Sequence, residues 1–369
     1  MRVPSILLLV LALALQAVGS EAACGSSGPP RRVRFWVGGN QVNPSSPPLN
    51  GTAGEGSSCK PYLIGNLTRY QQSISSVGIY GFTIRNGTMV DDGGIADPGF
   101  WPCIRQLRRQ FPHIKIGAAG GGPDDQFVWV SQHPKLFGKS VAAWVESHKG
   151  LIDELWTDFE PKWQTTGLIG RNETDVSLPA CTASAQTPRC KALRGINAAH
   201  AAMQAVLPTF AYVCCGNYSR SSSPGFRFPG AWTESCAEFA NAAPGVTIQA
   251  SNTYRDDTVS RGEWGGFERL LQQEIADITG NGRFPGNLKR LSPAICPDCA
   301  VGNSSATDLT MAQLYERADI ACDAGIVDWS GFTLFEIIKA TGSATLGHRY
   351  MEMLAYFRTG KKGLIKSEE

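Results

Sequence analysis

The sequence predicts an α/β fold: a single-domain, closed (β/α)8 barrel of the TIM type. Short β-branched or aromatic runs alternate with amphipathic stretches along the chain, a pattern typical of a parallel sheet covered by helices. Eight such strand–helix pairs follow one another over about 330 residues, a length at which α/β barrels fold as one domain. The chain is 369 residues long and 42% hydrophobic, which is enough to bury a large core.

Each predicted strand is a short apolar run bounded by Gly, Pro or polar residues, and each predicted helix repeats its apolar residues every three to four positions. The strands are expected at 32–37, 77–84, 114–119, 151–159, 210–213, 246–251, 291–295 and 327–335. The helices are expected at 62–74, 100–110, 127–148, 192–206, 232–241, 267–278, 311–324 and 350–357. Pro134 should kink or break the third helix, because proline lacks a backbone N–H.

No segment reads as a linker between domains. The Pro-, Ser- and Gly-rich stretch 43–58 is instead predicted as a long loop after the first strand, on the face where such barrels hold their sites. The 41 glycines fit a fold with many tight transitions from strand to loop. One barrel domain is therefore expected over residues 23–369.

The N-terminus has the pattern of a secretory signal peptide. Arg2 supplies a positive charge, residues 6–17 are almost wholly apolar, and small residues follow. We expect cleavage after about residue 22, since a dozen apolar residues are short for a membrane anchor. Six Asn-x-Ser/Thr sequons support the secretory pathway, with the extracellular space and a lysosome or vacuole both open: Asn50, Asn66, Asn86, Asn172, Asn217 and Asn303.

The 11 cysteines are most simply explained as structural disulfides of a protein made in an oxidising compartment. Cys181 and Cys190 flank a short polar loop and form the best single candidate pair. Cys296 and Cys299 form a Cys-Pro-Asp-Cys motif that resembles a redox or zinc half-site, which is the alternative. Because the count is odd, at least one cysteine is free or pairs between chains.

The net charge of the chain bears on the kind of molecule it could bind. With 34 Lys+Arg against 32 Asp+Glu, the formal net charge of +2 gives no electrostatic basis for nucleic-acid binding. The five histidines are scattered without ligand-like neighbours, so no metal or other cofactor is expected. We expect a monomer that has no membrane contact after signal cleavage, and the near-zero net charge suits a neutral partner.

The fourth predicted strand carries the residues best suited to chemistry. Residues 153–160 read DELWTDFE, and strand alternation turns Trp156, Asp158 and Glu160 toward the barrel axis. Two carboxylates two residues apart in a barrel mouth should share a proton, which raises one pKa and allows that acid to protonate a glycosidic oxygen. The alternative is an acidic strand end that binds an arginine or caps a helix.

These residues resemble the chitinase-type glycoside hydrolases of family 18, whose fourth strand reads Asp-x-x-Asp-x-Asp-x-Glu. Asp153, Asp158 and Glu160 match three of the four positions, and Trp156 occupies the remaining one. The family's third strand ends Ser-x-Gly-Gly, and residues 115–122 read KIGAAGGG, with Ala119 in place of the Ser. Weaker similarities lie in strands two, six and eight, at 79–82, 249–252 and 331–336.

The resemblance implies a substrate-assisted retaining mechanism, in which the substrate's own 2-acetamido oxygen attacks the anomeric carbon. Carried over, Glu160 is the general acid and base, Asp158 orients the acetamide, and Asp153 holds the base of the motif by hydrogen bonds. The resemblance also implies a carbohydrate substrate that contains N-acetylglucosamine. The predicted substrate-binding residues are Trp156, Tyr80, Gln249, Asn252, Tyr254 and Phe335.

Two departures keep alternatives open. In the family the residue at the position of Trp156 shares a proton with the next aspartate, so this relay is absent here. The indole must either fill the barrel core or narrow the site. Ser251 lacks the phenol that would hold the acetamide, unless Tyr254 supplies it. The alternatives are therefore a catalytically inactive carbohydrate-binding barrel and a glycosidase of another barrel family that uses a distant carboxylate such as Glu336.

Overall fold

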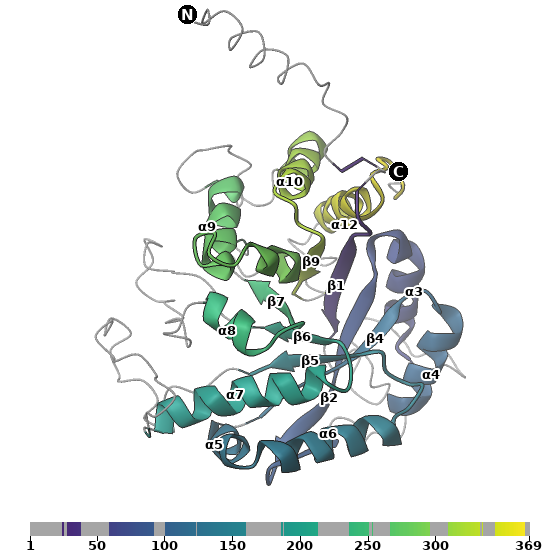
Figure 1. Ribbon diagram of the computed structural model, residues 1–369. Coiled ribbons are helices and arrows are strands. Elements are labelled where there is room, and N and C mark those ends of the chain that lie inside the picture. Colours follow the sequence, from purple (N-terminus) through teal and green to yellow (C-terminus); the bar gives the residue numbers. More distant parts are fainter. Residues whose placement is uncertain are drawn as a thin grey trace, which may run out of the picture.

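Eight parallel strands close into a barrel at the centre of the molecule (Figure 1). The computed structural model describes residues 24–25, 28–37, 59–91, 100–122, 124–159, 186, 188–212, 236–250, 253, 266–295, 309–332, 334 and 344–365. The barrel strands are β1 (Arg32–Val37), β2 (Ser76–Arg85), β4 (Lys115–Gly121), β5 (Glu154–Asp158), β6 (Thr209–Tyr212), β7 (Thr247–Ala250), β8 (Leu291–Ile295) and β9 (Asp328–Gly331). Strand β1 pairs with both β2 and β9, which closes the sheet and confirms the predicted fold class.

Helices surround the barrel and begin or end close to the expected positions. They are α3 (Pro61–Tyr70), α4 (Phe100–Gln110), α5 (Asp124–Gln132), α6 (Pro134–Ser147), α7 (Pro188–Gln204), α8 (Cys236–Ala242), α9 (Phe267–Thr279), α10 (Met311–Asp323) and α12 (Ala344–Thr359), with 3-10 turns η1 (Gln71–Ser73) and η4 (Pro285–Arg290). The expected helix 127–148 is two helices that meet at His133, because the proline at 134 disfavours a helical residue before it. Strand β9 ends at Gly331, short of the predicted 335, and Leu334 is already helical.

A ninth strand, β3 (Thr88–Asp91), was not predicted. It pairs antiparallel with the end of β2 and forms a hairpin. Its turn is Asn86–Gly87, with φ angles of 50° and 68°, which is the left-handed geometry that two-residue hairpin loops favour. A side chain at position 87 would also collide with the indole of Trp129. The sequon residue Asn86 is exposed at this turn, whereas Asn66 lies within α3.

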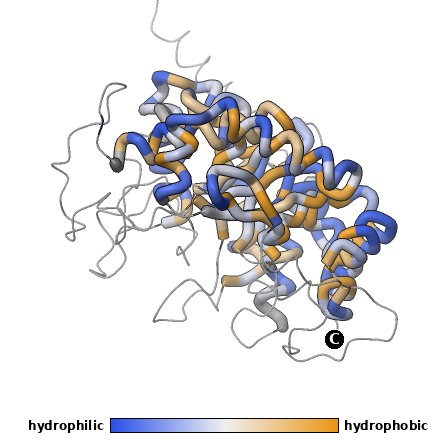
Figure 2. Tube along the Cα trace, turned by 90° about the horizontal axis from the view of Figure 1, so that it is seen from below, coloured by the Kyte–Doolittle hydropathy of each residue, from blue (hydrophilic) through white to orange (hydrophobic). Residues whose placement is uncertain are grey.

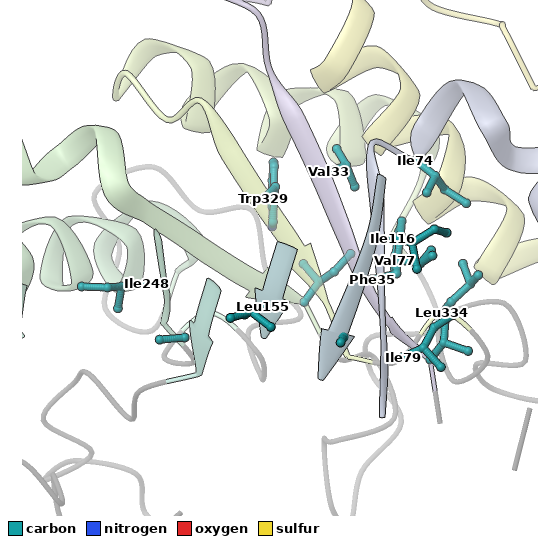
Figure 3. Close-up of a cluster of buried hydrophobic side chains, with 14 of the residues drawn as sticks. Val33, Phe35, Ile74, Val77, Ile79, Ile116, Leu155, Ile248, Trp329 and Leu334 are labelled. Carbon is teal, nitrogen blue, oxygen red and sulfur yellow. The ribbon is translucent and has the colours of Figure 1, made fainter. Parts of the chain in front are cut away.

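The main hydrophobic core lies between the strands and the helices. Alternate strand residues such as Val33, Phe35, Val77, Leu155 and Trp329 are buried there (Figure 3). Hydrophilic and hydrophobic positions alternate along the helices in Figure 2, as expected for helices that pack one face on a barrel. The remaining strand residues point to the barrel interior, where the candidate site is built.

Disulfides join elements that are distant in sequence. Cys24 bonds Cys322 of α10, and Cys59 bonds Cys103 of α4, with Cα–Cα distances of 5.4 and 4.7 Å. Cys190 is also disulfide-bonded, while its predicted partner Cys181 lies outside the described residues. For these five cysteines the prediction of structural disulfides is confirmed. None of the helices in the described ranges has the length and hydrophobicity of a membrane span.

Candidate active site

Charged residues fill the barrel interior near the N-terminal ends of the strands. Arg34 of β1 is 2% exposed and donates from Nε to both carboxylate oxygens of Asp328, at 3.0 and 2.9 Å. Its Nη1 lies 2.5 Å from Oε2 of Glu154 on β5. Burial alone would lower the pKa of Arg34, but the two carboxylates outweigh it and raise that pKa. This end of the barrel is thus occupied by a paired ionic network, which leaves the opposite end for a site.

An aromatic layer lies above this network. Trp36, Trp156 and Phe210 pack together with Ala119, and the two indoles meet edge to face with centroids 5.2 Å apart. The indole nitrogen of Trp156 donates to Glu154 Oε2 at 3.0 Å, back toward the ionic layer. The nitrogen of Trp36 donates to Oε1 of Gln249 at 2.6 Å.

Two glycines make room for Trp156. Ideal Cβ atoms on Gly78 of β2 and Gly117 of β4 would lie 2.1 and 2.2 Å from the Trp156 ring. Trp156 is 0% exposed, so of the two possibilities left by the sequence, the indole fills the barrel core. Gln249, also predicted to bind substrate, is likewise 0% exposed. A sugar could reach neither side chain without rearrangement of the residues above them.

Asp158 and Tyr80 meet at the C-terminal end of the strands, where barrel enzymes carry their active groups. The Tyr80 hydroxyl donates to Oδ2 of Asp158 at 2.5 Å, and both side chains are half-buried. Burial raises the pKa of Asp158, and the hydrogen bond from Tyr80 partly opposes this rise. The structure therefore places a carboxyl group of elevated pKa at the expected position, with a phenol beside it.

Asp153 lies elsewhere. It precedes β5 at the opposite end of the strand from Asp158, roughly 16 Å away at the usual rise per residue. Its Oδ2 accepts hydrogen bonds from the backbone N–H of Ile116 at 2.9 Å and from Arg108 at 2.6 Å. Asp153 thus ties β4 and α4 to the start of β5, and its side chain is not brought to Asp158.

The other predicted site residues, Glu160, Asn252, Tyr254 and Phe335, lie outside the described residues. Within β5, Trp156 and Asp158 face the barrel interior, as the predicted alternation required. Within the described ranges, no three His, Cys, Asp or Glu side chains gather into a group that could hold a metal ion.

Sequence reasoning missed two features of the interior. The ion pair between Arg34 and Asp328 was not expected, although the alternation of Arg34 with Val33 and Phe35 along β1 carries the signal for an inward-facing arginine. The contact between Tyr80 and Asp158 was also missed, because the two residues are 78 positions apart and no local pattern links them.

Comparison with protein-family models and with curated proteins finds no match. Among solved structures, a family 18 chitinase from Cycas revoluta in complex with (GlcNAc)3 superposes with a TM-score of 0.52 at 10% identity, covering 88% of this chain and 99% of that one. A family 18 N-acetylglucosaminidase from Paenibacillus barengoltzii gives 0.51 at 9% identity, with 89% and 99% covered. The C-terminal domain of a putative chitinase from Desulfitobacterium hafniense gives 0.52 at 8% identity, with 89% and 99% covered. At such identities the similarity establishes the fold, which is that of the family 18 chitinases.

Proposed function

We propose that the protein is a secreted glycoside hydrolase acting on glycans that contain N-acetylglucosamine, such as chitin. The observation that carries this proposal is Asp158: a half-buried carboxyl group of raised pKa at the C-terminal end of β5, in a barrel with the chitinase fold. The motif match at Asp158 and Glu160 and the near-zero net charge support a neutral amino-sugar substrate.

In the proposed reaction, Glu160 protonates the glycosidic oxygen while the substrate's 2-acetamido oxygen attacks the anomeric carbon. Asp158 accepts a hydrogen bond from the acetamide N–H and stabilises the positive charge of the resulting oxazolinium ion. Glu160 then removes a proton from the water that opens this ion, so the anomeric configuration is retained. Asp153 contributes indirectly, by holding β5 against β4 through Ile116.

A second candidate is a carbohydrate-binding barrel without activity. The observation in its favour is that Trp156 and Ala119 fill the interior where the resembling family has an aspartate and a serine, so the proton relay below Asp158 is missing. A site of this kind would still bind chito-oligosaccharides at its mouth.

The Glu160→Gln variant tests the proposal with a fluorogenic chitotrioside as substrate. We expect the wild type to cleave it and the variant to lose about 10²- to 10⁴-fold in kcat, the usual contribution of a general acid. The matched control is Glu146→Gln, which changes an exposed glutamate of α6 paired with Lys149 and should leave kcat unchanged.

Other outcomes would overturn the proposal in distinct ways. Binding of chito-oligosaccharides by a wild type that does not cleave them supports the inactive barrel. If Glu160→Gln keeps full activity and Glu336→Gln loses it, the results support a glycosidase of another barrel family that uses Glu336. Cleavage of sugars that lack a 2-acetamido group argues against substrate assistance.

Passage through the secretory pathway is part of the proposal. We expect mass spectrometry of the mature protein to begin near residue 23, with residues 1–22 removed. The disulfides of Cys24 and Cys59 support an oxidising compartment, since such bonds are rare in the cytosol.

A further inference from the structure

We infer that Tyr80 is a positioning residue for Asp158, and that it takes over the hydrogen bond that an aspartate at position 156 would make in the resembling family. This inference rests on the proposed function and assigns a role to a residue that the sequence had marked only as substrate-binding. It follows from three observations: the direction of the Trp156 indole, the small residues between Tyr80 and Asp158, and the packing of the Tyr80 ring.

Trp156 gives no hydrogen bond to Asp158. Its single polar hydrogen points to Glu154 Oε2, 3.0 Å away and deeper in the barrel. Its neighbour across the β4–β5 ladder, Ala119, has no polar side-chain atom. The described hydrogen bond that Asp158 receives from a side chain is that of Tyr80, at 2.5 Å.

Tyr80 can reach Asp158 because the strand between them carries small residues. β4 separates β2 from β5, so the phenol must span two interstrand spacings of about 4.8 Å each. The residues of β4 that face the interior at this level are Ala119 and Gly121, which are small and leave space above the strand. A serine at 119 would place a hydroxyl in that path, so Ala119 and Tyr80 fit one another.

The Tyr80 ring packs against the aromatic layer of the barrel interior. Its centroid lies 5.8 Å from that of Trp36, within the aromatic layer that also contains Trp156. The pairing of β2 with β4 shifts register between Tyr80 and Phe82, and such irregularities turn a side chain to a new direction. The phenol is therefore fixed by packing before any substrate arrives.

This contact leaves Asp158 suited to its proposed task. Oδ2 is held by the phenol, and Oδ1 has no hydrogen-bond partner among the described residues, so it can accept the acetamide N–H. In this contact the phenol is the donor and the carboxylate oxygen is the acceptor. Burial raises the pKa of Asp158, and the hydrogen bond donated by Tyr80 opposes this rise by favouring the ionised form, which is the form that would stabilise an oxazolinium ion.

The test compares Tyr80→Phe with a matched control in the full-length protein. Tyr80→Phe removes one oxygen and keeps the ring on Trp36. The control, Tyr356→Phe, removes an equivalent hydrogen bond to Asp319 (2.6 Å) between α12 and α10, far from the barrel mouth. With chitotrioside we expect kcat to fall about tenfold or more in Tyr80→Phe with KM little changed, since a hydrogen bond to a charged group is lost.

The pH profile separates positioning from packing. Among the described residues, the titratable groups beside Asp158 are Tyr80 of β2 and Tyr212 of β6, while β4 contributes none. The acid limb of kcat/KM should move to higher pH in Tyr80→Phe, because Asp158 loses the donor that lowers its pKa. The Tyr356→Phe profile should match the wild type.

Two results would overturn the inference, and they differ from failure of the proposed function. Suppose that the wild type is active and that Tyr80→Phe has the same kcat and the same acid limb of the pH profile as the control Tyr356→Phe. Tyr80 then does not position Asp158, and the proposed function stands. If the wild type is inactive, the proposed function fails, and ¹³C carboxyl NMR decides on Tyr80, with Asp158→Asn identifying the signal. Asp158 should then titrate at higher pH in Tyr80→Phe than in the wild type, and an equal midpoint would refute the contact.

Discussion

Gly117 should be one of the least replaceable residues of the barrel, and Gly117→Ala tests how tightly Trp156 fills it. The Cβ atom added at 117 would lie 2.2 Å from the indole nitrogen of Trp156 and 2.4 Å from its Cδ1. Atoms that are not bonded need about 3.5 Å, so the ring must move by about 1.3 Å. Gly78 blocks one direction of escape, because an atom at its Cβ position would lie 2.1 Å from the same ring.

The expected cost combines two effects. Overpacking a buried site costs about 1–3 kcal/mol in the free energy of unfolding. A displaced indole also weakens its hydrogen bond to Glu154, now 3.0 Å, and a bond to a charged group contributes about 1.5–3 kcal/mol. We therefore expect Gly117→Ala to lose about 3–5 kcal/mol, a large part of the roughly 5–15 kcal/mol that stabilises a typical protein.

Urea unfolding followed by tryptophan fluorescence measures this loss, and a double-mutant cycle identifies its origin. Trp156→Leu should reduce the cost of Gly117→Ala to less than about 1 kcal/mol, because the smaller side chain leaves room. The matched control is Gly65→Ala in α3, where an added Cβ meets nothing within 4 Å and should instead stabilise the helix by about 0.5–1 kcal/mol. Additive effects of the two barrel substitutions would refute the reasoning that Trp156 and Gly117 share one packed space.

Two further predictions concern buried charge. Arg34→Met should destabilise the protein by about 3 kcal/mol in urea unfolding, because Glu154 and Asp328 lose their buried partner and keep only the more exposed Lys115 and Arg32. Lys149→Met, at an exposed pair, should cost less than about 0.5 kcal/mol. Similar losses in both variants would contradict this reasoning. Burial lowers the pKa of His200 from 6.5 to about 4. The stability that depends on a neutral His200 is therefore complete above pH 6.5 and is lost as the pH falls toward 4. This loss in the free energy of unfolding amounts to about 3 kcal/mol. Unfolding free energies between pH 7 and 4 should fall less steeply for His200→Gln, and an unchanged slope would argue against this role.

Much of the fold could be predicted from local patterns. Strands β1 and β8 and helix α4 have the expected residues, because each is a short periodic run with clear boundaries. The hairpin strand β3 was missed although Asn86–Gly87 is a strong turn signal, since Thr88–Asp91 is only four residues long and packs against helix α6 at the edge of the sheet. The end of β9 was placed too late because the apolar run continues past Gly331 into a helical segment.

In the candidate site, too, local patterns predicted some features and contacts between distant strands decided the others. Alternation within one strand was sufficient to turn Trp156 and Asp158 inward. What Trp156 does there depends on Gly78 and Gly117, which lie on other strands and are linked to it only by the closure of the barrel. The partner of Asp158 depends in the same way on Tyr80, two strands away. Single-strand patterns therefore predict which residues face the interior, while their contacts follow from strand order and register.

The tryptophan in the fourth-strand motif is accordingly more than one changed position. An indole at 156 requires glycine at positions 78 and 117, because a side chain at either would overlap the ring. Its N–H also needs an acceptor, which is Glu154, itself paired with Arg34. With the indole in this place, no carboxylic acid stands at position 156, directly below Asp158. A donor for Asp158 must then come from the side, and among the inward-facing residues of the described strands the phenol of Tyr80 meets this need. The tryptophan that stands where the resembling family has an aspartate and the contact between Tyr80 and Asp158 are thus two parts of one arrangement of the barrel interior.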